Sequence, residues 1–169
     1  MELDLDDGAH VLDAGCGPAG VHLILCEQRV LAIDPLLDRY RELTIFQQGK
    51  GEHVRFRQQG IETLPGTGEY DAVFCLNVIN HVRDLDRCLS ALKGALAPNG
   101  VMVLSVDAHR SAVAQKIFSR LPGDVLHPQQ YTLEQYERLL ALAGLRITRS
   151  LLHRRERIFD YWVFKLEHA

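Results

Sequence analysis

Two neighbouring stretches, Val11-Leu-Asp-Ala-Gly-Cys-Gly-Pro-Ala-Gly20 and Val30-Leu-Ala-Ile-Asp34, decide the fold of this chain. The first is an apolar run that predicts a buried strand, followed at once by glycines that let the backbone turn sharply. The second, a short helix-length further on, is another apolar run that ends in one carboxylate. This order is typical of a nucleotide-binding β-turn-α-β unit, whose second carboxylate accepts hydrogen bonds from ribose hydroxyls.

Asp13 distinguishes between the ligands that such a unit can bind. The glycine spacing of Gly15-Cys-Gly-Pro-Ala-Gly20 suits a flavin or nicotinamide dinucleotide equally well. A carboxylate two positions before the first glycine, however, repels a pyrophosphate and attracts a cationic group. Asp13 and Asp34 together therefore favour a nucleoside that is joined to an amino acid and carries no phosphate. S-adenosylmethionine is such a molecule.

Three motifs, taken in order, resemble the class I S-adenosylmethionine-dependent methyltransferases over nearly the whole chain. Asp13-Ala-Gly-Cys-Gly17 is similar to the first motif of that family, and Asp34 to its ribose-binding acid. Tyr70–Val82 is similar to the fourth strand and the loop beyond it, and Leu92–Leu104 to the helix, turn and fifth strand. The resemblance implies S-adenosylmethionine as cofactor, S-adenosylhomocysteine as product, and a small-molecule acceptor methylated on oxygen, nitrogen or carbon.

Strand-like and helix-like segments alternate, which predicts an α/β fold with a Rossmann-like, doubly wound, seven-stranded sheet and helices on both faces. Strands are expected at Ala9–Ala14, Arg29–Asp34, His53–Gln58, Asp71–Asn77, Gly100–Asp107, Leu145–Leu151 and Ile158–Leu166. Helices are expected at Gly20–Gln28, Leu36–Gln48, Arg83–Ala97, Ser111–Arg120 and Thr132–Ala143. Pro98–Gly100 indicates a turn, and the charged Leu152–Arg157 a hairpin before an antiparallel last strand. The size predicts one domain over residues 1–169.

The carboxyl ends of parallel strands meet at one edge, so the predicted cofactor-binding residues should converge on one crevice. We assign Asp13 to the methionine amino group, with capping of the following helix as the alternative. We assign Asp34 to the ribose, with capping of a helix that begins near Pro35 as the alternative. The full predicted set is Asp13, Gly15, Cys16, Gly17, Asp34, Pro35, Ile61, Glu62, Leu76 and Asn77.

The adenine end of the site depends more on the family resemblance. Gly60 stands where many members of the resembled family carry an acid that meets the adenine amino group. Backbone groups at Ile61 and Glu62 are therefore expected to bind the ring, although Glu62 is equally well explained as a surface acid. Asn77 is expected to bond the methionine moiety, while Leu76 packs around the ring system.

Histidines supply the candidate catalytic groups. Methyl transfer mainly requires alignment of the acceptor and exclusion of water, and a base is needed only where the acceptor loses a proton. His81 follows the predicted fourth strand, and its ordinary pKa suits proton abstraction; packing and capping is the alternative. His109, His127 and Tyr131 border the acceptor side in the resembled family. Their spacing matches no metal motif, so no metal is predicted.

Composition narrows the class of protein further. The chain has 169 residues, 47% of them hydrophobic, 24% charged, and a formal net charge of −3, which disfavours a nucleic-acid partner. Asn77-Val-Ile-Asn80 also lacks the Pro-Pro motif of enzymes that methylate base or amide nitrogens. No apolar stretch approaches the ~18–20 residues of a membrane span. Four cysteines without metal-type pairing predict buried reduced thiols in a cytoplasmic protein. A monomer or homodimer is expected.

About eight residues precede the first predicted strand, whereas members of the resembled family commonly carry one or two helices there that help to cover the active site. We therefore expect either an open pocket or a lid supplied by another segment or subunit. Two alternative functions remain open. One is a noncatalytic module that binds the cofactor or a partner, and the other is a flavin- or nicotinamide-dependent oxidoreductase, which Asp13 and the lack of a second domain disfavour.

Overall fold

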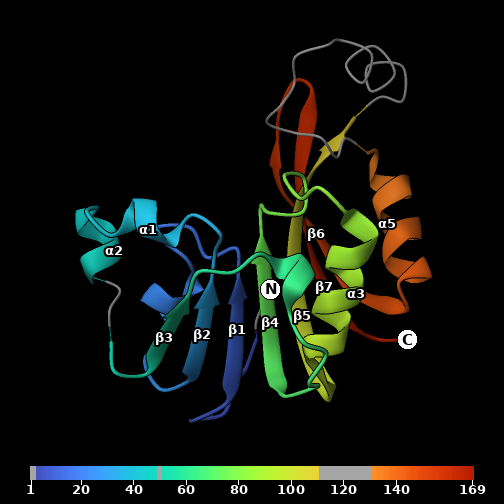
Figure 1. Ribbon diagram of the computed structural model, residues 1–169. Helices are drawn as coiled ribbons and strands as arrows, with labels where there is room; N and C mark the ends of the chain where they lie inside the picture. Colours follow the sequence, from blue (N-terminus) through green and yellow to red (C-terminus); the bar gives the residue numbers. More distant parts are fainter. Residues whose placement is uncertain (1–2, 49–50, 111–130) are drawn as a thin grey trace.

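The computed structural model describes residues 3–48, 51–110 and 131–169, and its centre is a seven-stranded sheet (Figure 1). The strands lie in the order β3-β2-β1-β4-β5-β7-β6. Their bounds are β1 His10–Ala14, β2 Arg29–Ile33, β3 Val54–Arg57, β4 Tyr70–Leu76, β5 Leu96–His109, β6 Leu145–Arg155 and β7 Phe159–His168. The predicted fold class, a Rossmann-like α/β sheet of seven strands, is confirmed.

Five strands, β3 to β5 in sheet order, run parallel, and β7 runs antiparallel to both of its neighbours. The backbone N–H of Glu156 donates to the carbonyl oxygen of Phe159 at 3.0 Å and closes the β6–β7 hairpin. The antiparallel last strand and the hairpin before it are therefore confirmed, although residues 152–155 of the predicted connection belong to β6 and the turn itself is shorter. Ala14 pairs with Ile33 in the register of β1 and β2. The carboxyl ends of β1, β2 and β4 consequently meet at one edge, to which their arrowheads point in Figure 1.

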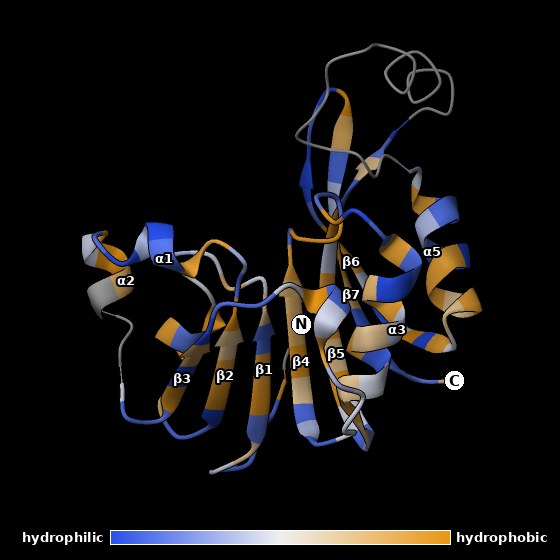
Figure 2. Cartoon of the chain, viewed as in Figure 1, coloured by the Kyte–Doolittle hydropathy of each residue, from blue (hydrophilic) through white to orange (hydrophobic). Residues whose placement is uncertain are grey.

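The central strands are apolar on both faces, which is why each is a continuous apolar run in the sequence. Leu12 and Val73 are fully buried in the cluster that lies under the larger helices, whereas Val11 and Ala72 are fully buried in a second cluster on the opposite face. The hydropathy colours in Figure 2 show these strands as predominantly hydrophobic. Burial on both faces therefore fixes which strands lie at the centre.

Two well-capped helices cover one face of the sheet. At α3 (Leu85–Ala95) the Asp84 carboxylate accepts the Arg87 N–H at 2.9 Å, and at α5 (Leu133–Leu142) Thr132 and Gln135 form a reciprocal capping box. Three helices are expected in this half of the chain: Arg83–Ala97, Thr132–Ala143 and Ser111–Arg120. The first two are confirmed with ends within two residues of the structure. The third lies outside the described residues.

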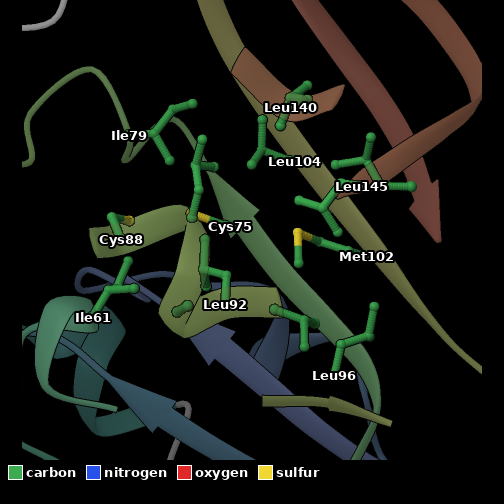
Figure 3. Packing of buried hydrophobic residues seen from close by; sticks show 14 of the residues in the cluster. Ile61, Cys75, Ile79, Cys88, Leu92, Leu96, Met102, Leu104, Leu140 and Leu145 are labelled. Atoms are coloured by element: carbon green, nitrogen blue, oxygen red, sulfur yellow. The ribbon is translucent and has the colours of Figure 1, made fainter. Parts of the chain in front are cut away.

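The main core lies between these helices and the sheet. In Figure 3 the side chains of Cys88 and Leu92 from α3, Leu140 from α5, and Met102 and Leu104 from β5 gather in one cluster. Burial raises the pKa of the Cys88 thiol to about 12, with a smaller contribution from two nearby carboxylates. The thiol therefore stays protonated in this core.

The cysteine prediction needs one correction. Cys16, Cys75 and Cys88 are buried free thiols, as expected, but Cys26 is exposed. Cys26 lies in the irregular stretch just before β2 rather than in a helix that faces the core.

The first crossover also differs from the prediction. The helix expected over Gly20–Gln28 is only a 3₁₀ turn, η1 (Val21–Leu23). His22 turns inward and bonds Asp13 through its backbone and its ring. Ile24 is 77% exposed, so the apolar residues of this stretch do not share one buried helical face. A run of apolar residues without that periodicity does not hold an amphipathic helix against the sheet.

The second crossover is broken into two short helices. A single helix was expected over Leu36–Gln48, but the structure has α1 (Leu37–Tyr40) and α2 (Thr44–Gln48). Leu37 and Phe46 are both buried in the second cluster. Nine residues make 2.5 turns of an α-helix, so one continuous helix would place these two side chains on opposite sides. The break between the helices lets both side chains face the same core.

Strand β5 begins before the Pro98–Gly100 turn rather than after it. Leu96 pairs with Tyr70, and the next pair joins Val101 to Ala72, so the turn forms a bulge within the strand. A Cβ at the glycine of this bulge would lie 2.8 Å from the carbonyl oxygen of Tyr70. The turn expected at Pro98–Gly100 is therefore a bulge inside β5, and the strand begins earlier than predicted.

A buried amide connects the loop after β4 to the neighbouring elements. Asn80 is 2% exposed, and its Nδ2 donates to the Asp107 carbonyl oxygen at 3.1 Å and to the Tyr136 hydroxyl at 2.9 Å. Its Oδ1 accepts the Asp107 N–H at 3.4 Å. Burial raises the pKa of Tyr136, which remains a neutral partner. These bonds fix the loop to β5 and α5.

We expect Asn80→Ala to lower the free energy of unfolding by about 2–3 kcal/mol, because buried groups on two elements lose their hydrogen bonds. Tyr136→Phe removes one of these bonds and keeps the ring, so it should cost about 1 kcal/mol. Urea titration of the three proteins at neutral pH measures both changes. Equal stability of Asn80→Ala and the unmodified chain would contradict the role of this amide.

Candidate functional site

The glycine turn after β1 folds across the end of β2. The backbone N–H groups of Gly15 and Cys16 both donate to the Ile33 carbonyl oxygen, at 2.8 and 3.0 Å. Gly15 has a φ of +75° and Gly17 a φ of +55°, in the left-handed region that glycine adopts without strain. The two glycines therefore let three residues reverse direction over the neighbouring strand.

The same turn contacts the loop after β4. A Cβ at Gly15 would overlap the Val78 side chain, so only glycine permits this close approach. At Gly17, by contrast, a Cβ would meet no atom within 4 Å. One glycine is thus needed for packing, while the backbone of the other borders open space in which a ligand can lie.

Asp34 holds this turn from the end of β2. It is 8% exposed; its Oδ2 accepts the Gly17 N–H at 3.1 Å and its Oδ1 the Leu36 N–H at 2.7 Å. Its bond to the Leu36 N–H lies just before α1, whose N-cap is Leu36 and has no side-chain cap, so Asp34 is not the N-cap named as the alternative. Each carboxylate oxygen has two acceptor positions, so hydrogen bonds from ribose hydroxyls are compatible with both contacts.

Asp13, near the end of β1, is 4% exposed and bonds the following turn. Its Oδ2 accepts the backbone N–H of His22 at 3.2 Å and lies 2.9 Å from His22 Nδ1. The contact with the backbone is the capping interaction named as the alternative for Asp13. The assignment of Asp13 to the donor amino group remains a prediction that these contacts allow.

Asn77 marks the end of β4. Its φ of +60° is left-handed, which is rare for a residue other than glycine and is best tolerated by asparagine and aspartate. The backbone N–H of Asn77 donates to Ser105 Oγ at 2.8 Å, and that oxygen lies 2.5 Å from the Tyr161 hydroxyl. The Asn77 side chain is exposed and the preceding Leu76 is half-buried. A partly buried chain of polar groups thus fixes the backbone from which the amide projects.

The predicted adenine segment forms a short 3₁₀ turn, η2 (Ile61–Thr63). Ile61 is buried in the main core, so only its backbone can meet a ligand. Glu62 is half-buried, and its carbonyl oxygen accepts Arg87 Nε–H at 2.9 Å. The N–H groups of a first helical turn have no acceptor within the helix, which suits them to a ring nitrogen.

The two remaining predicted cofactor-binding residues differ in solvent exposure. Cys16 is 4% exposed and packs into the second cluster, so its side chain does not project from the turn. Pro35 is exposed directly after Asp34.

The acceptor-side candidates are only partly gathered. His81 is exposed in the loop after β4, where its N–H donates to the Val78 carbonyl oxygen at 2.8 Å. His109 is buried at the end of β5 and packs on a phenylalanine ring, while its N–H donates to the Tyr131 carbonyl oxygen at 2.9 Å. His127 lies outside the described residues. The structure therefore joins His109 to Tyr131 and leaves His81 at the surface.

Sequence reasoning did not find three polar residues near this site: His22, Ser105 and Asn80. Each is buried and bonds a predicted site residue or the loop that carries it. A polar residue inside an apolar run, as at Ser105 in β5, was the available signal.

Two cavities in the described structure are lined mainly by residues outside the predicted site. A cavity of about 630 Å³, lined in part by Arg29 and Tyr70, shares no residue with the predicted set, and one of about 250 Å³ shares only Leu76. In the described ranges no three His, Cys, Asp or Glu side chains gather as a metal site requires. No helix within those ranges is long and apolar enough to cross a membrane.

The predicted cofactor-binding residues fit a nucleoside that carries an amino acid. Asp34 supplies acceptors for hydroxyls, Asp13 supplies negative charge at the tip of β1, and open space borders Gly17. Two carboxylates at one turn oppose a pyrophosphate, whose charge has the same sign. The residues present therefore fit S-adenosylmethionine and fit a dinucleotide poorly.

Among curated proteins, the chain is similar to the ubiquinone biosynthesis O-methyltransferase of Rickettsia prowazekii, with 35% identity over 97 residues. That match covers 56% of this chain and 38% of that protein, so the chain spans about two fifths of its length. The enzyme of the same name from Brucella anthropi is 28% identical over 171 residues, covering 92% of this chain and 67% of that protein.

A solved structure with a similar fold is Burkholderia thailandensis 1,6-didemethyltoxoflavin-N1-methyltransferase with bound 1,6-didemethyltoxoflavin and S-adenosylhomocysteine. The TM-score is 0.70 at 21% identity, and the match covers 96% of this chain and 72% of that one. Residues 1–150 match the family model described as methyltransferase domain. That match spans most of the chain, so the chain belongs to the class I S-adenosylmethionine-dependent methyltransferase family.

Proposed function

We propose that this chain binds S-adenosylmethionine and catalyses methyl transfer to a hydroxyl group of a small molecule. The observation that carries the proposal is the bond from Gly17 N–H to Asp34 Oδ2, which joins the glycine turn and the ribose acid at one edge. The names of the Rickettsia and Brucella relatives support oxygen as the acceptor atom.

Each part of the donor would meet a different element of the edge. Asp34 would accept the ribose hydroxyls, and the N–H groups at the start of η2 would meet adenine. Asp13 would face the amino group, and the exposed Asn77 amide would bond the carboxylate of the methionine moiety. When bound, the donor supplies a sulfonium-activated methyl group, so the chain has to align the acceptor and exclude water.

His81 is the proposed general base. It lies in the loop after β4, one residue beyond Asn80, whose buried amide fixes that loop to β5 and α5. An imidazole there would take the proton from an acceptor hydroxyl as the oxygen attacks. Its exposure leaves room for a small acceptor beside it.

We expect calorimetry to show binding of S-adenosylhomocysteine and no binding of NADH or FAD. Asp34→Ala should abolish that binding, because it removes the ribose acceptors and the bond to Gly17. Asp38→Ala is the matched control, since Asp38 is an exposed carboxylate in α1 that pairs with Arg41. Unchanged affinity in Asp34→Ala, with Asp38→Ala behaving alike, would refute the ribose assignment.

His81→Ala should slow methyl transfer by about 10²-fold or more, the usual contribution of a general base, while leaving the affinity for S-adenosylhomocysteine unchanged. Single-turnover rates and calorimetry on the same preparations separate the two effects. His10→Ala, an exposed histidine at the opposite edge of the sheet, serves as control. A rate equal to that of the unmodified chain would show that His81 has a structural role only.

Incubation with methyl-labelled donor and a panel of catechols, phenols, amines and thiols tests the acceptor class. We expect label in hydroxylated aromatic compounds, because oxygen is the atom named for the similar enzymes. Label confined to amines or thiols would overturn the oxygen assignment. Donor binding without transfer to any acceptor would instead indicate a noncatalytic cofactor-binding module.

A further inference from the structure

His22 is a buried side chain to which the proposed reaction gives no role. It lies in η1, is 2% exposed, and meets the Phe56 ring edge-on with ring centroids 5.2 Å apart. Burying an imidazole is unfavourable unless the ring is hydrogen-bonded. The partner of this ring therefore indicates why a histidine stands here.

That partner is the carboxylate of Asp13. Its Oδ2 receives both the backbone N–H of His22, at 3.2 Å, and the ring Nδ1, at 2.9 Å. Gly20 packs against the same oxygen so closely that a Cβ there would overlap it. Every hydrogen bond given to the Asp13 carboxylate by the described parts of the chain thus ends on Oδ2, and Oδ1 is left for a ligand.

The other ring nitrogen indicates which tautomer makes this contact. Within the described structure, His22 Nε2 is buried and has no hydrogen-bond partner. A proton on Nε2 would be a buried donor without an acceptor, which is more costly than an unprotonated nitrogen. The proton therefore belongs on Nδ1, from which the ring donates to the Asp13 carboxylate in a charge-assisted hydrogen bond.

We propose that His22 is a positioning residue for the amino group of the donor. It fixes Oδ2 of Asp13 from two directions, so that Oδ1 presents its charge to the ammonium of the methionine moiety. This inference rests on the proposed function, because it takes Asp13 as the ligand of that amino group. Loss of the His22 contact should then lower the affinity only for ligands that carry the amino-acid end.

Two ligands and two variants test the proposal. S-adenosylhomocysteine carries the amino-acid end, whereas 5′-methylthioadenosine has the same nucleoside without it. His22→Asn places an amide N–H near the position of Nδ1, and His22→Gln moves the amide toward the position of Nε2. We expect His22→Gln to lower the affinity for S-adenosylhomocysteine about tenfold and the affinity for 5′-methylthioadenosine less than twofold. His22→Asn should keep both affinities within about threefold of those of the unmodified chain.

The possible outcomes separate this inference from the proposed function. If the unmodified chain does not bind S-adenosylhomocysteine, the proposed function fails. If it binds and His22→Gln weakens both ligands equally or neither, His22 is structural only and the inference fails. The same holds if His22→Asn behaves like His22→Gln, since the position of the donor would then be irrelevant.

A measurement on the unmodified chain tests the proposal even if the variants do not fold. Histidine-selective ¹⁵N NMR should show His22 protonated at Nδ1 and unprotonated at Nε2, with the Nδ1 proton signal moving when S-adenosylhomocysteine binds and staying in place with 5′-methylthioadenosine. A proton on Nε2, or the same movement with both ligands, would overturn the proposal.

Discussion

The backbone at the end of β2 is the constraint on which the rest of the site depends. The Ile33 carbonyl oxygen accepts two N–H groups from the glycine turn, and the Asp34 carboxylate accepts a third. A shift of this turn would break these three bonds to the end of β2, whose Ile33 pairs in register with Ala14. Since Gly15 also packs against Val78, the loop after β4 is placed by the same contacts. One carbonyl and one carboxylate thus position three segments that lie far apart in the sequence.

The strands could be predicted from the sequence because their burial leaves a local trace, whereas the crossovers could not. Leu12 and Val11 face opposite clusters and are both buried, so β1 had to be apolar throughout. The break between α1 and α2 depends instead on Leu37 and Phe46 reaching one core together, which is a tertiary requirement. The helix expected over Gly20–Gln28 failed for a similar reason, since the direction of that stretch is set by a contact with β1 rather than by its own periodicity.

The residues of the candidate site also differ in whether a local sequence pattern or a tertiary contact determines their position. Asp13 and Asp34 stand at strand ends, and the end of a strand is visible in the sequence, so both were placed at the correct edge. The inward side chain of Cys16 and the left-handed backbone of Asn77 depend on neighbours that are distant in the sequence. His22 shows the limit most clearly. Its ring contacts Asp13 from the short turn η1, whereas the sequence predicted a longer helix there.

The electrostatic character of the turn is set by the two carboxylates that flank Cys16. Burial raises the pKa of that thiol, and the negative charges of Asp13 and Asp34 raise it further. The carboxylates of Asp13 and Asp34 thus place negative charge on the interior side of the turn. The same field opposes a phosphate and favours an ammonium or sulfonium ion. The glycines alone suit either kind of nucleotide, so we propose that the two carboxylates select a cationic nucleoside; one of them, Asp13, is also bonded by His22.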